Sequence, residues 1–149
     1  MFLFRIFLTA FAFQNELVEL EKLSLLDELN YARANPEAYG LAIDVDLSYI
    51  HATMHLEWDK GLARQAQRYS KFLYENEYLV HSGDPRYRES ILWNYDVCNS
   101  IKQFIIDEDV PSLAHRKHLL DSREIKAGIG ISKGRVGRWY CVYVVILTQ

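Results

Sequence analysis

Four side chains in this sequence could do chemistry together: two imidazoles, His81 and His115, and two carboxylates, Glu89 and Asp107. None of the four fits the apolar periodicity around it, and each falls at the end of an expected element or in a loop. A carboxylate beside an imidazole fixes its tautomer and makes the second ring nitrogen a better ligand. Two such pairs suit a borderline divalent metal ion or proton transfer. The same residues also suit solvated element ends without function, and the spacing alone favours that simpler interpretation.

Two other patterns fit known chemistry less well. His51 and His55 have the i, i+4 spacing of a zinc-binding helix, but no glutamate follows the first histidine, which disfavours a metalloprotease. Ser82 directly follows His81. Because adjacent side chains point apart, His81 is poorly placed to activate this serine as a nucleophile.

The charged residues around His115 have other expected roles. His118, three positions further on, could face the same ion, but we favour an exposed position for it. Arg116 is expected to pair with a carboxylate, either Glu89 or Glu124, in a structural role.

Helices must position most of these residues. Apolar residues recur at helical spacing in three segments, 16–35, 60–77 and 94–106. In the first of these, Ser24 is the expected start signal, and Pro36 ends the helix. The segment 37–58 has no clean period and is interpreted as a connection with room for one short helix.

Two shorter stretches complete the expected elements that precede the strands. The segment 81–90 is rich in Gly, Pro, Ser and Asp and is interpreted as a loop. Pro111 disfavours a helical conformation at Val110, and a short helix is expected to restart at Ser112 or Leu113.

The C-terminal part predicts two strands, 124–132 and 138–149, joined by a hairpin loop at 133–137. One face of the second strand carries Trp139, Cys141, Tyr143, Val145 and Leu147, and the other carries Tyr140, Val142, Val144 and Ile146. Both faces are apolar, so both must be covered, and only the preceding helices can cover them. This pattern predicts an α+β fold, a three-layer α-β-α sandwich with a small, mostly antiparallel sheet.

Composition limits the class of protein. The chain has 149 residues, half of them hydrophobic and a quarter charged, which predicts one globular domain. A formal net charge of -3 and no basic stripe disfavour nucleic acid as a partner. No run reaches the about 18 apolar residues of a membrane-spanning helix.

The N-terminal segment 1–14 has one positive charge, Arg5, before an apolar run and a small-x-small pattern. We interpret it as a secretory signal peptide, or alternatively as an apolar helix docked on the domain, which then spans 15–149. The two cysteines, Cys98 and Cys141, could pair in a secreted protein or could both be free.

Several stretches resemble the CAP superfamily, which comprises cysteine-rich secretory proteins, antigen 5 and pathogenesis-related 1 proteins and is also called the SCP domain. They are LDELNYARANPEAYG, LEWDKGLARQAQRYSKFLYENEYLVHSG, RES, FIIDEDVPSLAHRKHLLDSREIKAGIGIS and WYCVYVVILTQ. The resemblance runs in order from about Leu25 to the C-terminus. It implies an α-β-α sandwich, which agrees with the pattern of the last strand.

The resemblance also implies a cleft lined by two histidines and two acids. They correspond to His81, Glu89, Asp107 and His115, with the two histidines as ligands of a divalent metal such as zinc. Three positions depart from the family pattern. Residues 88–90 replace a Gly-Glu-Asn motif, and the sequence at 107–110 leaves Glu108 as an alternative cleft acid. His118 replaces the usual asparagine.

The function that the resemblance implies is that of an extracellular, non-catalytic module. Such a module would bind a divalent metal in the cleft, a sterol or fatty acid on its helical surfaces, and in some members a protein partner. A hydrolase of the protease type, with His81 or His115 as general base, is the alternative. A third interpretation is a structural or interaction domain in which the four cleft residues only hold a loop.

Overall fold

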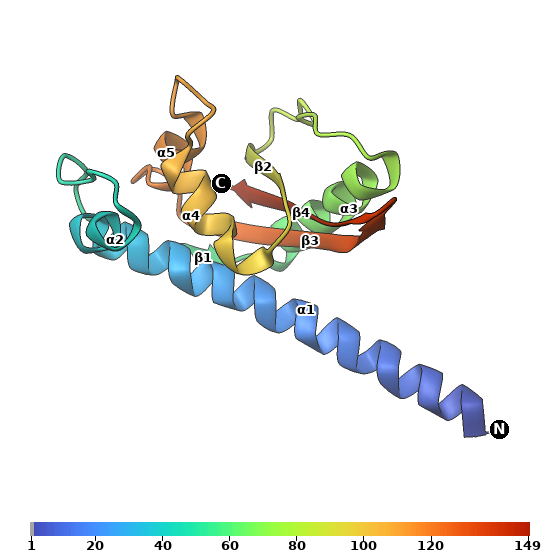
Figure 1. The fold of residues 1–149 in the computed structure, drawn as a ribbon. Coiled ribbons are helices and arrows are strands. Elements are labelled where there is room, and N and C mark those ends of the chain that lie inside the picture. Colours follow the sequence, from blue (N-terminus) through green and yellow to red (C-terminus); the bar gives the residue numbers. More distant parts are fainter. Residues whose placement is uncertain (1) are drawn as a thin grey trace.

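The computed structural model describes the backbone of residues 2–149 and the side chains from Phe13 onward. The elements are α1 (Phe2–Ala34), α2 (Pro36–Ile43), β1 (Glu57–Trp58), α3 (Lys60–Asn76), β2 (Arg88–Asn94), the 3-10 helix η1 (Val97–Asn99), α4 (Ser100–Ile106), α5 (Ala114–Leu119), β3 (Lys126–Val136) and β4 (Trp139–Thr148). The N-terminal part of α1 extends away from the rest of the molecule (Figure 1).

The four strands form one sheet in the order β1-β3-β4-β2. β1 is parallel to β3, whereas β4 is antiparallel to both of its neighbours, β3 and β2. Val136 pairs with Trp139, so the β3–β4 hairpin turns on Gly137 and Arg138 alone. Gly137 has a φ of +60°, a conformation that suits glycine in such a tight turn. The predicted loop at 133–137 is therefore wrong in length, because most of it belongs to β3.

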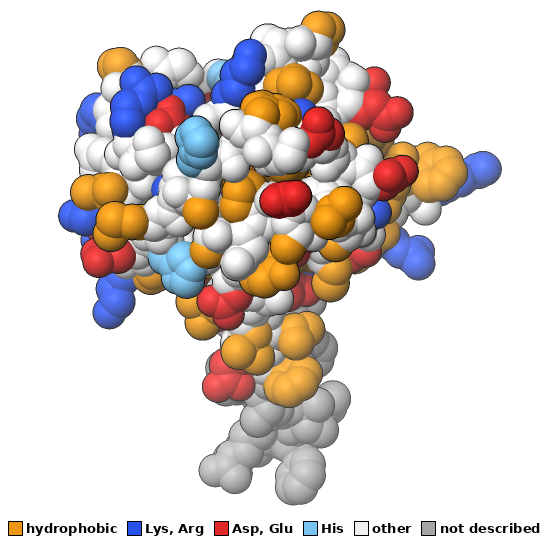
Figure 2. Space-filling view, turned by 90° about the vertical axis from the view of Figure 1, so that its left-hand side faces the viewer, with side chains coloured by type: hydrophobic (Ala, Val, Ile, Leu, Met, Phe, Trp, Pro, Cys, Tyr) orange, Lys and Arg blue, Asp and Glu red, His pale blue; other side chains and the backbone are white. Residues whose placement is uncertain are grey.

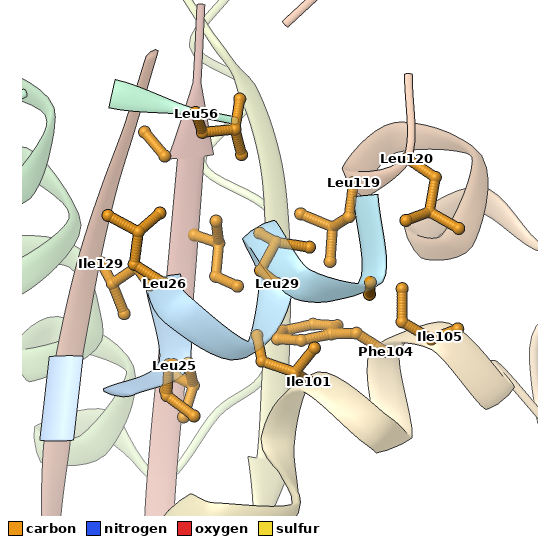
Figure 3. Packing of buried hydrophobic residues seen from close by; sticks show 14 of the residues in the cluster. Leu25, Leu26, Leu29, Leu56, Ile101, Phe104, Ile105, Leu119, Leu120 and Ile129 are labelled. Carbon is orange, nitrogen blue, oxygen red and sulfur yellow. The ribbon is translucent and has the colours of Figure 1, made fainter. Parts of the chain in front are cut away.

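Helices cover both faces of the sheet, which confirms the predicted three-layer α-β-α sandwich (Figure 1). On one face, Cys141, Tyr143, Val145 and Leu147 of β4 pack with α3. On the other, the core between the sheet, α1 and α4 includes Val142, Val144 and Ile146. Figure 3 shows Leu25, Leu26 and Leu29 of α1 beside Ile101, Phe104 and Ile105 of α4 in this larger core.

The helix α3 lies unusually close to β3, and local sequence explains both its start and its position. Asp59 caps the helix, because its side chain accepts a hydrogen bond from the Leu62 N–H at 2.8 Å. A Cβ on Gly128 would lie 2.0 Å from the backbone N of Ala63, and one on Gly130 would lie 2.2 Å from the backbone of Ala66. Glycines in β3 therefore allow the backbones to touch.

Three predicted element boundaries are wrong. The first helix passes through Ser24 without interruption, so this residue is no helix start. The predicted loop at 81–90 ends at Tyr87, because 88–90 begin β2. The predicted helix at 94–106 consists of η1 and the shorter α4. In β2, apolar Ile91 and Leu92 face opposite layers, so the strand has no alternating pattern to reveal it.

Two sequence-based interpretations concern the N-terminus and the cysteines. Side chains up to residue 12 lie outside the described ones, so the signal-peptide interpretation of 1–14 stays a prediction. Among the described residues, no helix is long and apolar enough to cross a bilayer. Cys98 is exposed on η1 and Cys141 is buried in β4, and both are free thiols.

Candidate functional site

The first histidine–acid pair joins the loop after α3 to the start of β2. Nδ1 of His81 lies 2.8 Å from Oε1 of Glu89, and the same oxygen accepts the Ser82 N–H at 2.9 Å. The Glu89 side chain is nearly buried at 9% exposure, whereas His81 is 58% exposed. The strand thus provides a fixed carboxylate, and the loop provides an accessible ring.

The second pair joins the end of α4 to the start of α5. Asp107 follows α4 in the left-handed conformation, with a φ of +56°. Its Oδ1 lies 2.7 Å from Nδ1 of His115, and its Oδ2 accepts the backbone N–H groups of His115 and Arg116 at 3.0 and 3.3 Å. Asp107 is therefore the acid in contact with His115, and the neighbouring Glu108 is exposed.

The acids of the two pairs line different pockets. His115 and Asp107 line a pocket of about 350 Å³ between β2, α4 and the turn that follows it. Glu89 lines a smaller pocket of about 140 Å³ beside α3, and the two pockets share no lining residue. Within residues 13–149, no group of three or more His, Cys, Asp or Glu side chains could hold a metal ion.

The donor chemistry decides which kind of metal site these residues fit. In both pairs the carboxylate contacts Nδ1, which leaves Nε2 as the ring atom for a ligand. For the described residues, a closed structural site with four protein ligands is ruled out by the absence of a third donor. The residues present fit at most an open site in which imidazole supplies the protein ligands and water the rest.

A buried polar chain that was missed from the sequence joins β2, α5, β4 and the segment before β3. Ser90 Oγ lies 2.7 Å from Nδ1 of His118, Nε2 of His118 lies 2.6 Å from Thr148 Oγ1, and Thr148 donates to Glu124 at 2.6 Å. Because the Thr148 hydroxyl proton goes to Glu124, Thr148 accepts from Nε2–H of His118. Nδ1 of His118 then accepts from the Ser90 hydroxyl.

This chain makes His118 a buried neutral residue, which corrects the prediction of an exposed one. Burial, the largest cause, and the nearby Arg88 lower the pKa of His118 from 6.5 to about 4. A strand assignment for 88–94 could have revealed only the Ser90 end of this arrangement, since alternate residues of a strand face opposite layers. It would have placed Ser90 on the face opposite Glu89.

The arginines also differ from expectation. Arg88, rather than Arg116, pairs with Glu124, and its Nη1 donates to Glu124 and Asp121, both at 2.7 Å. Arg116 donates to the Ile105 and Ile106 carbonyls at the end of α4 instead. The prediction that Arg116 pairs with Glu89 or Glu124 is wrong, because α5 directs its guanidinium toward orphan helix carbonyls.

No family model and no curated protein matches the sequence, but solved structures match the fold. An outer surface protein from Borrelia burgdorferi is 18% identical, with a TM-score of 0.58 over 89% of this chain and 94% of that one. Venom allergen-like protein 4 from Schistosoma mansoni is 12% identical, with a TM-score of 0.59 over 87% and 89% of the two chains. NaASP2, in a structure with Zn²⁺, is 12% identical, with a TM-score of 0.51 over 88% and 78%.

The chain has the fold of the CAP superfamily. The resemblance seen in the sequence is thereby confirmed at the level of the fold. Identities of 12 to 18% carry no site residue or ligand from those proteins to this one. For this CAP-fold chain, site chemistry must come from its own residues, which are the two histidine–acid pairs and the buried polar chain of His118.

Proposed function

We propose that this CAP-fold protein is an extracellular, non-catalytic module that binds a divalent metal ion through its histidine–acid pairs. The supporting observation is the repeated bond from a carboxylate to Nδ1, at 2.8 Å in His81–Glu89 and 2.7 Å in His115–Asp107. This second contact orients a ring and strengthens Nε2 as a zinc ligand. A zinc ion in the similarly folded NaASP2 structure and the outer surface protein among the matches are consistent with the proposal.

The proposed ion is bound weakly and exchangeably. Within residues 13–149 the protein offers it no third His, Cys or acid, so most of its coordination positions go to water or to an external ligand. When bound, such an ion supplies a positive charge and open positions. At each pair the chain itself contributes an oriented ring, which a strand carboxylate holds at His81 and a helix-end carboxylate holds at His115.

The proposal of a non-catalytic role rests on the hydroxyl groups near the histidines. Ser82 Oγ accepts the Asp84 N–H at 3.2 Å and is part of a turn. Ser90 does contact a histidine, His118, but both residues are buried, so a substrate has no access to them. Neither serine is placed as an accessible nucleophile beside His81 or His115.

A hydrolase remains the second candidate, because Asp107 holds His115 in the way that an acid orients a general base. It would act through an activated water rather than a serine. Substitution of His115 separates the two candidates, since a hydrolase loses turnover of an ester or peptide substrate and a binding module loses only metal affinity.

The metal proposal is tested by calorimetric titration of Zn²⁺ into the full chain and its variants. We expect His81→Gln or His115→Gln to lower the affinity by about tenfold or more, and Glu89→Gln to lower it by about tenfold through loss of ring orientation. His55→Gln, which changes an exposed histidine outside both pairs, is the matched control and should bind like the wild type.

Two results would contradict this proposal. Equal zinc binding by the wild type and both pair variants would place the ion elsewhere. A Glu89→Gln variant with a lower melting temperature and an unchanged zinc affinity would support the purely structural interpretation, because Glu89 also anchors the loop through the Ser82 N–H.

A sterol or fatty acid ligand and a protein partner are further parts of the predicted function. In the face shown in Figure 2, hydrophobic side chains are scattered among charged ones rather than joined in one apolar surface. We therefore propose these ligands only as secondary to the metal. Equilibrium binding of a radiolabelled sterol to the full chain, with excess unlabelled sterol as competitor, tests them.

A further inference from the structure

A pocket rich in arginine lies at the start of α3. It has a volume of about 480 Å³, within the range of small-molecule sites. Three arginines line it, Arg64 and Arg68 from α3 and Arg86 from the loop before β2, and Asp59 is the only acid among the described residues of its lining. Neither histidine of the two histidine–acid pairs belongs to this lining, so the proposed metal does not explain the pocket.

The register of β2 against β4 places Tyr87, which also lines the pocket, on the α3 side of the sheet. Glu89 is the register partner of Leu147, which packs with α3. Alternate residues of an extended chain share a face, and Tyr87 packs against the same apolar cluster. Arg86 is tied to this place, because Gln149 Nε2 donates to its carbonyl at 3.3 Å. The loop and the helix therefore bring their arginines to one pocket.

The Arg86 guanidinium is oriented in the free protein. Its Nε donates to Asp84 Oδ1 at 2.9 Å and its Nη2 donates to Asp84 Oδ2 at 2.6 Å. Its Cζ lies over the Tyr87 ring, 5.4 Å from the centroid. The hydrogen bonds to Asp84 raise the pKa of Arg86, so the group stays charged. Within residues 13–149 its Nη1 forms no hydrogen bond, which leaves an oriented donor for a ligand.

The two arginines of α3 are unpaired. Arg64 and Arg68 are exposed one turn apart, and within residues 13–149 neither forms an ion pair. Like charges at i, i+4 repel and cost helix stability. Burial raises the pKa of Tyr87, and the charges of Arg86 and Arg68 both oppose this shift, so both guanidinium groups lie near the phenol. An anion in the pocket would relieve the repulsion.

The acids near the pocket are already engaged. Asp59 accepts the Leu62 N–H at 2.8 Å as the cap of α3, and Asp84 holds Arg86. Three arginines against these two acids leave a positive charge that the described side chains do not neutralise. The pocket therefore attracts anions and repels a metal ion.

We propose that this pocket binds the phosphate group of a small phosphate ester, between Arg68 and Arg86. Planar guanidinium groups match phosphate oxygens in charge and in geometry. A carboxylate would offer two oxygens and a single charge, which is a poorer match to several arginines from two elements. The pocket is larger than a phosphate ion, and Leu62 and Tyr87 offer apolar surface to the organic part of the ester.

This inference goes beyond the proposed function, since it needs neither histidine–acid pair. A soluble ester and a lipid head group share the phosphate chemistry on which it rests. The pocket does adjoin the smaller one that Glu89 lines, because Gln65, Arg86 and Tyr87 border both. The experiment must therefore exclude a phosphate that is bound through a metal ion.

The test is calorimetric titration of the full chain with phenyl phosphate at pH 8, where a phosphate monoester carries two charges. Benzoate serves as the carboxylate comparison, and EDTA is present throughout to remove metal ions. We expect phenyl phosphate to bind with a Kd of about 1 mM or lower, more weakly as sodium chloride is added, and benzoate to bind at least about tenfold more weakly.

Variants test the arginines one at a time. Arg68→Gln and Arg86→Gln should each weaken phenyl phosphate binding by about tenfold, and Arg86→Lys, which keeps the charge, should not restore it. Arg123→Gln is the matched control. Arg123 binds Asp121 through the same two nitrogen atoms, at 3.0 and 2.6 Å, and lies outside the pocket, so this variant should bind like the wild type.

Three results would overturn the inference. They are equal affinities of the Arg68, Arg86 and Arg123 variants, benzoate binding as tight as that of phenyl phosphate, and phosphate binding that appears only when zinc replaces EDTA. Arg68→Gln changes an exposed helix residue, so its result does not depend on how the loop tolerates a change at Arg86.

A vesicle arm identifies the source of the phosphate group. Co-sedimentation with phosphatidylcholine vesicles that contain phosphatidic acid, lost in Arg68→Gln but kept in Arg123→Gln, would support the site and assign the ester to a lipid. Phenyl phosphate binding without co-sedimentation would support the site and assign it to a soluble ester. Zinc affinity enters neither result, so the metal proposal can fail independently.

Discussion

His81 and His115 have the same partner chemistry but different surroundings. The His81 side chain is 58% exposed and depends on a loop for its position, whereas the His115 side chain is 19% exposed and begins a helix. The carboxylate of Asp107 also accepts hydrogen bonds from two backbone N–H groups at the start of α5, so the backbone itself fixes the second pair. Of the two rings, His115 is therefore the better oriented in the free protein.

Each predicted cleft histidine contacts a predicted cleft acid, whereas a single cleft that joins all four residues stays a prediction. His81, Glu89, Asp107 and His115 could be found because polar residues interrupt apolar patterns at element ends. The buried position of His118 could not be found, since it depends on three partners, Ser90, Thr148 and Glu124, from distant segments. The local pattern around a histidine gives no information about such partners.

The buried position of His118 predicts acid sensitivity. Its pKa is about 4 in the folded protein and 6.5 in an ordinary environment, so below pH 6.5 the unfolded chain takes up a proton that the folded chain refuses. Its contribution to stability is present above pH 6.5 and is lost as the pH falls toward 4, by up to about 3 kcal/mol at about 1.4 kcal/mol per pKa unit. Burial is the main cause, and Arg88 adds to it while Glu124 opposes it.

The measurement is the urea-unfolding free energy of the wild type and of His118→Gln between pH 7 and pH 4. The variant should be less stable at pH 7 and should depend less on pH, because glutamine cannot take up the proton. His55→Gln should keep the wild-type slope. Parallel curves for all three proteins would show that His118 does not carry the acid sensitivity.

At the scale of the elements, long and regular patterns were predicted well. The helix predicted at 60–77 is α3, and the apolar residues on both faces of β4 correctly predicted that both faces are covered. Shorter elements were missed for physical reasons. β1 has only two residues, and β2 carries polar and apolar residues on both faces, so neither shows a period. Their pairing partners, β3 and β4, create them through tertiary contacts.

The contact between α3 and β3 predicts a strong effect of one methyl group. Gly130→Ala should lower the free energy of unfolding by about 2 kcal/mol or more, because its Cβ would meet the Ala66 backbone, which cannot turn aside. Gly134→Ala in the same strand is the matched control. Its Cβ would meet only the Tyr74 hydroxyl end, which can rotate away, so a smaller loss is expected. Equal losses in urea unfolding would argue against the close approach.

At the scale of the whole molecule, Arg33 joins segments that are far apart in the chain. This residue of α1 is 1% exposed, and its guanidinium donates to the carbonyls of Met54, Leu119, Asp121 and Glu124. It links α1, the segment before β1, α5 and the segment before β3. These contacts need the planar guanidinium group with its several N–H donors. The single ammonium group of lysine cannot reach all four carbonyls.

Arg33→Lys should therefore destabilise the protein by about 3 kcal/mol or more, since it leaves buried carbonyls without donors. The measurement is the urea midpoint, with Arg64→Lys as the control at an exposed site of α3. A midpoint for Arg33→Lys that matches the control would show that the carbonyls find other donors.

The position of Arg33 in the chain has a consequence for biosynthesis. All four of its carbonyl acceptors lie further toward the C-terminus, and three of them are beyond residue 118. During synthesis, the Arg33 guanidinium therefore stays hydrated until residues 119–124 have left the ribosome. The strand β4, which follows all of these acceptors in the chain, lies in the sheet between β3 and β2. A nascent chain stalled before this point should remain a substrate for chaperones and proteases.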